Sequence, residues 1–111
     1  MESILTSIKK MLGIDASYTH FDADIIMHIN SVFMILSQLG VGPKEGFAIN
    51  DEFAVWSDFI SDSVKLNSVK TYVFLRVKLL FDPPLSNIVV ESMNRAANEL
   101  EFRINAEVDT A

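Results

Sequence analysis

The residues best suited to chemistry in this chain are two histidines and two aspartates close together in sequence, His20, Asp22, Asp24 and His28. Imidazole nitrogens and carboxylate oxygens bind zinc or manganese, and Asp24 and His28 would lie one turn apart on a helix. Structural roles explain the same residues: Asp22 as a helix cap, Asp24 as an acid favoured by the helix dipole, and the histidines as polar fillers. We expect no metal site, because neither a tight ligand spacing nor a third ligand-bearing helix is evident.

The rest of the sequence offers no pattern for catalysis. Neither histidine lies beside a recognisable nucleophile motif, and glycine patterns that bind phosphate are missing. The chain contains no cysteine, which excludes disulfides and thiolate metal sites. We therefore expect neither enzymatic activity nor a cofactor.

Two amphipathic helices would position the histidines and aspartates. Ser3 is suited to cap a first helix, within residues 1–13, and Gly13 is suited to end it. Asp22 would cap a second helix, whose apolar residues recur at steps of three and four until Gly40. The predicted core positions on this second helix are Ile29 and Leu36.

The middle of the chain is predicted to be a long loop over residues 40–54. Two of the four glycines and one of the three prolines fall between residues 41 and 53, and no helical periodicity continues through this stretch. A helix of one or two turns should follow, beginning near Trp56. The Trp56 side chain is a predicted core residue that attaches the loop to the rest of the fold.

Residues 66–81 form an unusually apolar segment, for which a helix is predicted over a strand because of its length. Its apolar residues occupy almost every side of a helix, so they must be buried in a core or against a second copy. Phe81 is a predicted core residue. Asp82, Pro83 and Pro84 should form a tight corner, because a proline excludes the helical conformation at the residue before it.

The last predicted helix follows this corner. Ser86 would cap it, and Leu85 would pack on its first turn as a hydrophobic staple. Leu100 is a predicted core residue in its apolar stripe. The helix should end near Ala106, with residues 105–111 forming a flexible acidic end. The pattern as a whole predicts one all-α domain over residues 1–111, a small bundle of four to five helices with its long loop between the second and third.

The composition favours assembly with other copies. Half of the 111 residues are hydrophobic and the mean hydropathy is +0.27. A domain of this length has only a modest core, and soluble monomers rarely expose large apolar patches. We therefore expect part of the apolar surface to be covered in an oligomer. No secretory signal and no membrane-spanning segment is predicted.

Charge is divided unevenly along the chain, whose net charge is −6. Between residues 15 and 62 there are eight acids and one lysine, whereas residues 63–81 have four cations and no acid. Pairing within the chain, or simple solubility, would explain this division. The more specific alternative is that the two oppositely charged surfaces meet between identical subunits. The candidate interface residues are Lys65, Lys70, Arg76 and Lys78 of one subunit and Asp58 and Asp62 of the next.

Several short segments, in this order, also indicate a family. They are Ser3 to Gly13, Asp24-Ile-Ile-Met-His-Ile-Asn-Ser31 leading to Leu39-Gly-Val41, Trp56-Ser-Asp-Phe59, Val69-Lys-Thr-Tyr-Val73, Leu79-Leu-Phe-Asp-Pro-Pro84 and Asn98-Glu-Leu-Glu-Phe-Arg103. In these segments the chain resembles the head-tail connector, or adaptor, proteins of long-tailed bacteriophages and prophages. Phe102 stands where tryptophan is frequent in that family, which is a conservative departure.

The resemblance implies a structural virion protein without enzymatic activity, which forms a dodecameric ring beneath the portal vertex of the capsid. Its partners would be its own copies, the portal protein and head-closure or tail proteins, joined at the virion neck after assembly in the bacterial cytoplasm. Genomic DNA would pass through the ring without specific binding, since an acidic wall offers few cations to phosphates. The alternative is a small acidic helical regulator, or host-takeover protein, that acts by protein–protein binding.

Overall fold

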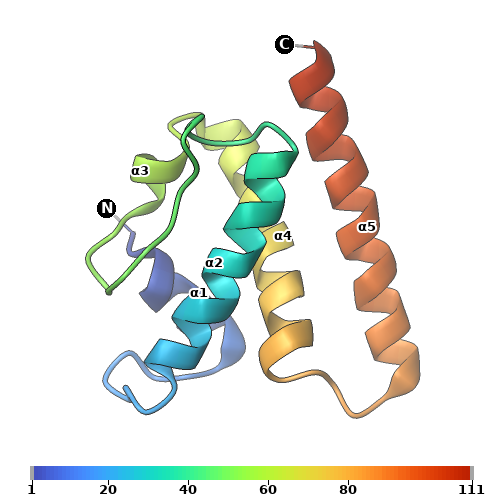
Figure 1. Ribbon diagram of the computed structural model, residues 1–111. Helices are drawn as coiled ribbons and strands as arrows, with labels where there is room; N and C mark the ends of the chain where they lie inside the picture. The colour runs from blue at the N-terminus through green and yellow to red at the C-terminus, as the bar shows by residue number, and fades with distance from the viewer. Residues whose placement is uncertain (1, 111) are drawn as a thin grey trace.

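The protein is an all-α bundle, as the periodicity predicts (Figure 1). The computed structural model describes residues 2–110, and within that range it contains five helices and no strand. The helices are α1 (Ile4–Leu12), α2 (Asp22–Gln38), α3 (Trp56–Phe59), α4 (Ser63–Phe81) and α5 (Asn87–Thr110).

Helix α4 is the centre of the bundle and packs against α1, α2 and α5. The helix predicted over residues 66–81 is confirmed, and it begins slightly earlier because the Asp62 carboxylate accepts hydrogen bonds from the first backbone amides. Its core face presents Val69, Val73 and Val77, all buried. Val64 near its start is 79% exposed, so the subunit alone covers only part of this apolar helix.

The corner between α4 and α5 lies where the prolines predict it, at residues 82–86. Two expectations about its neighbours are wrong. Leu80, which the apolar pattern of residues 66–81 predicts to be buried, is 54% exposed in the subunit. Leu85 is fully exposed and forms no staple, because the irregular linker holds it away from both helices. Phe81 is half-buried, with its ring centroid 5.5 Å from that of Phe21.

The ends of α1 and α2 follow local capping rules with one exception. The Ser3 hydroxyl accepts a hydrogen bond from the Thr6 amide, and Gly13 adopts the left-handed conformation that ends α1. The prediction that Asp22 caps α2 is wrong. Phe21 occupies the cap position without a side-chain hydrogen bond, and Asp22 is the first helical residue.

The loop over residues 40–54 is tied to the helices by side chains. The Asn30 amide donates to the Ile49 carbonyl at 2.9 Å and accepts from the Ile49 amide at 2.8 Å. The Trp56 indole N–H donates to the Ser7 hydroxyl at 2.8 Å. The chain thus satisfies buried polar groups in a segment without regular structure.

Helix α5 lies along one side of the bundle against α4 and continues to Thr110, past the predicted end near Ala106 (Figure 1). Its buried residues are Ala97 and Ile104, while Val108 packs partly buried beside the turn at Gly40. Residue 111 lies outside the described residues. Of the predicted core residues, Ile29, Leu36 and Trp56 are buried, and Phe81 and Leu100 are half-buried because they lie at the rim of the bundle.

Candidate assembly surfaces

The structure does not gather the histidines and aspartates into a metal site. Asp22 Oδ1 lies 2.8 Å from the Lys9 ammonium, while the His20 ring packs edge-on against Phe21 with centroids 4.8 Å apart. The His28 ring lies beside Phe81, and Asp24 is exposed. Among the side chains that the structure describes, no three His, Cys, Asp or Glu residues form a group that could hold a metal ion.

Lys9 is the structural residue that sequence reasoning missed. It is 1% exposed, and its ammonium donates to the carbonyls of Ala16 at 3.1 Å and Tyr18 at 2.7 Å in addition to its pairing with Asp22. Two hydrogen-bonded carbonyls and one neighbouring carboxylate surround the ammonium group, which lowers the penalty for burying it. Its burial could have been inferred from its position, since Lys9 lies one helical turn after Leu5 on the apolar face of α1.

Three of the four cations proposed for the subunit interface already have partners within the chain. Lys70 pairs with Glu2 and lies over the Trp56 ring. Lys78 binds Asp82 at 2.8 Å, and the Arg76 guanidinium donates to Asn98 at 2.9 Å while lying 3.5 Å from Glu101.

The two proposed acidic partners also have structural roles. The Asp58 carboxylate accepts a hydrogen bond from the Val55 amide at the start of α3, and the Asp62 carboxylate caps α4. The three cations thus pair with acids outside residues 15–62, and the two aspartates bind backbone amides rather than the cations of residues 63–81. An interface that used these charges would have to form alongside their contacts within the subunit, or replace those contacts.

A partly buried polar network joins α4 to α5. The Tyr72 hydroxyl donates to Glu101 at 2.6 Å and accepts from the Arg76 Nε group at 3.3 Å. Burial raises the pKa of Tyr72 above its usual value, and the hydrogen bond to Glu101 raises it further. Together with the buried Ala97 and Ile104, this network attaches α5 to α4.

The α4–α5 corner carries the densest group of exposed apolar side chains along the chain. We call this group the corner patch, and it consists of Leu80 at 54%, Leu85 at 103%, Ile88 at 78% and Val89 at 44% exposure. Single exposed hydrophobic residues are common on protein surfaces, but four around one turn indicate a contact surface.

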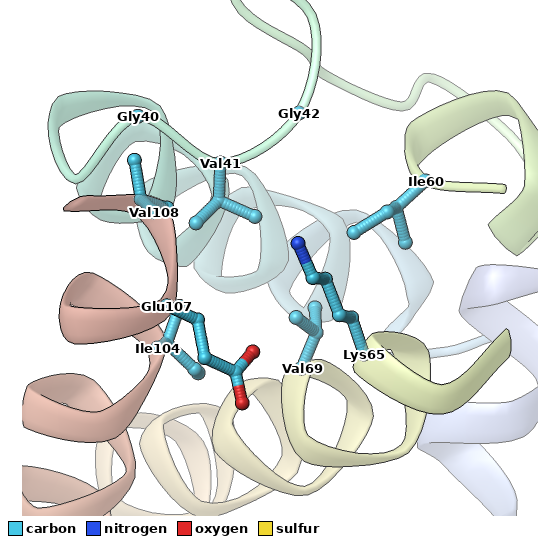
Figure 2. A pocket seen from close by; sticks show the side chains of 9 residues that line it. All are labelled: Gly40, Val41, Gly42, Ile60, Lys65, Val69, Ile104, Glu107 and Val108. Atoms are coloured by element: carbon cyan, nitrogen blue, oxygen red, sulfur yellow. The ribbon is translucent and has the colours of Figure 1, made fainter. Parts of the chain in front are cut away.

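A cavity of about 110 Å³ lies at the opposite end of α5 (Figure 2). Its walls come from α4, α5, the turn after α2 and Ile60. The Lys65 and Glu107 side chains extend into this space, as Figure 2 shows. Here it is called the C-terminal cavity, and its lining residues are Gly40, Val41, Gly42, Ile60, Lys65, Val69, Ile104, Glu107 and Val108.

Comparison with known proteins identifies a family over nearly the whole chain. A family model described as "Phage connector protein" matches residues 4–111. No curated protein and no solved structure matches the chain. Within the described part of the chain, no helix combines the length and hydropathy needed to cross a membrane.

Proposed function

Since this chain belongs to the phage connector protein family, we propose that it is a structural subunit of the virion neck, which assembles as a ring between the capsid portal and the tail. The ring is dodecameric and extends the DNA channel of the portal. Its neighbours in the particle are its own copies, the portal protein and head-closure or tail proteins, and it assembles in the host cytoplasm.

The family match over residues 4–111 is the observation that carries this proposal. The surface of the subunit supports it, since a helical domain of this size leaves the corner patch and the 75% exposed Phe102 in contact with water. Apolar surface of this kind is covered when subunits associate. A ring of identical copies covers it with repeated heterologous contacts.

The acidic balance supports passage of DNA rather than its binding. With a net charge of −6 and five of the nine lysines and arginines paired with carboxylates, the subunit offers few groups to replace the counterions around phosphate. The proposed channel therefore guides DNA without holding it. Duplex DNA should not be retained by the purified ring at about 0.15 M salt.

The test is the assembly state and its location. Native mass spectrometry of the purified chain, alone and with the portal protein of the phage that encodes it, should give a closed ring in at least one of the two samples. Antibody labelling of intact particles should mark the neck. A stable dimer in both samples and unlabelled particles would instead favour the small-regulator alternative.

A further inference from the structure

We propose that two copies of the free subunit form an antiparallel dimer through the outer face of α5, the side of the helix opposite the buried Ala97 and Ile104. Helix α5 lies at one edge of the bundle, so a second copy can reach this face (Figure 1). The inference goes beyond the proposed ring, because a contact between two identical surfaces is complete after two copies and cannot extend a ring.

Four charged side chains form a row on the outer face of α5. Acids and arginines alternate in this row at intervals of four residues, and all four side chains are exposed: Glu91, Arg95, Glu99 and Arg103. The row extends over about 18 Å of helix. Among the described side chains, Arg103 pairs with Glu99 at an N–O distance of 2.7 Å. Neither Glu91 nor Arg95 has an ion pair in that part of the chain.

The alternating signs make the row complementary to itself in one antiparallel alignment. When two copies of α5 run in opposite directions with Ala97 of each at the same level, Arg95 of one copy faces Glu99 of the other. In the same alignment Glu91 faces Arg103, so all four charges of each copy meet an opposite charge. Sliding one helix by a single turn sets like charges opposite each other. Charge complementarity therefore favours a second copy in this one alignment.

The exposed apolar side chains of α5 fit the same alignment. Ile88 is 78% exposed and Phe102 is 75% exposed, and both lie within about 40° of Arg95 around the helix axis. Phe102 of one copy is level with Ser92 of the other. Ile88 is level with Ala106, so each large apolar side chain meets a small residue. The dimer thus covers apolar surface that the single subunit leaves in water.

The ion pair already present on this face is compatible with the dimer. Both of its side chains are more than 60% exposed, so the pair contributes little to the fold. The two hydrogen bonds from the Arg103 guanidinium go to the same carboxylate oxygen, Oε1 of Glu99. A carboxylate has acceptor sites on both oxygens. Glu99 can therefore keep Arg103 while it accepts Arg95 of the second copy.

An exchange of charges between two variants tests this contact. Arg95→Glu and Glu99→Arg each place like charges opposite each other, so each variant alone should dimerise at least about tenfold more weakly than the natural chain. An equimolar mixture of the two sets glutamates against arginines again, and its heterodimer should return to within about threefold of the natural dissociation constant. Sedimentation equilibrium of the full-length chains at about 50 mM salt measures these constants, because higher salt would screen the charges.

Two further variants separate this contact from a general effect of charge. Lys44→Glu changes the net charge as Arg95→Glu does, at an exposed position of the loop over residues 40–54, and should leave the dissociation constant within about threefold. Phe102→Ser keeps every charge and should weaken the dimer about tenfold, because it removes apolar surface from the contact. Circular dichroism checks that each variant keeps its helices.

Three results would overturn the inference: a natural chain that stays monomeric up to about 1 mM, a mixture that dimerises no better than its separate components, or an equal loss in Lys44→Glu. If rings form with the portal protein while the free chain gives no dimer, the inference fails and the proposed function stands. If the dimer forms and no ring appears in either sample, the inference stands and the proposed function fails.

Discussion

Residues 2–60 supply most of the buried core, whereas residues 82–110 add to it only Ala97 and Ile104 among the described side chains. In the first region, buried polar groups such as Lys9 and Asn30 find partners in the same chain, and the indole of Trp56 is both buried and hydrogen-bonded. In the second region, Leu85 and Ile88 face water and α5 packs mainly on α4. From this difference we propose that the first region mainly maintains the fold and that the second presents surface for assembly.

The largest expected effect comes from breaking the first region at its buried cation. Lys9→Met should lower the free energy of unfolding by about 3–5 kcal/mol, because it leaves Asp22 and two loop carbonyls without their donor. Urea denaturation followed by circular dichroism measures it. Lys10→Met, at an exposed neighbouring position, is the control and should change stability by less than about 0.5 kcal/mol. A loss below about 1 kcal/mol for Lys9→Met would show that Lys9 does not hold the segment between α1 and α2 in place.

Phe81 lies at the boundary between the two regions and should have an intermediate effect. A fully buried phenylalanine costs about 3–5 kcal/mol when truncated, and Phe81 is only half-buried, so Phe81→Ala should cost about 2 kcal/mol. Chemical denaturation provides the value, with Leu80→Ala as the exposed neighbour for comparison. Equal losses for the two variants would mean that Phe81 contributes no specific packing.

The Tyr72 network predicts a pH effect on the attachment of α5. Because the pKa of Tyr72 is raised above 10.0 in the folded protein, the native state keeps a proton that the unfolded chain loses near pH 10. This stabilisation is complete below about pH 10 and is lost as the pH rises towards the folded pKa. Tyr72→Phe should cost about 1–2 kcal/mol at pH 7 and should flatten the decline in stability above pH 10.

The decline in the free energy of unfolding with rising pH is measured by urea titrations at several pH values between 8 and about 11. Tyr18→Phe is the control, since Tyr18 is half-exposed and belongs to no α4–α5 network. An unchanged alkaline slope in Tyr72→Phe would show that the titration of other groups dominates.

The smallest expected effect on stability is at the corner patch. Leu85→Asp should change the free energy of unfolding by less than about 0.5 kcal/mol, because its side chain contacts water in the subunit. Its effect should appear in assembly alone. A large loss of stability in a sample shown to be monomeric would mean that Leu85 packs within its own chain.

Periodicity and turn residues predicted most of the fold because they act locally. Ser3, Gly13 and the two prolines determine helix ends through their own backbone or hydroxyl chemistry, so a sequence alone reveals them. The same local capping rules assigned Asp22 to the cap of α2, which is wrong because they consider only neighbouring residues. Its partner Lys9 lies on another helix, and no local rule could identify that contact.

The candidate site was less predictable because surfaces depend on tertiary contacts. The charge division along the chain was visible, but most of those charges turned out to be paired with nearby elements, as with Lys70 and Glu2. Leu85 looked like a staple because its spacing fits one, while the path of the linker after Pro84 determines its exposure. The end of α5 was placed too early because its last turn packs on the distant turn at Gly40.

Hydrogen exchange on the free subunit and on the assembled ring tests the central claim most directly. We predict that protection rises on assembly in residues 80–90 and stays unchanged in α1 and at Trp56. Residues 106–111 should gain protection when a portal partner is added. Increased protection confined to α1 and the loop over residues 40–54, with residues 80–90 unchanged, would contradict the assignment of assembly to the second region.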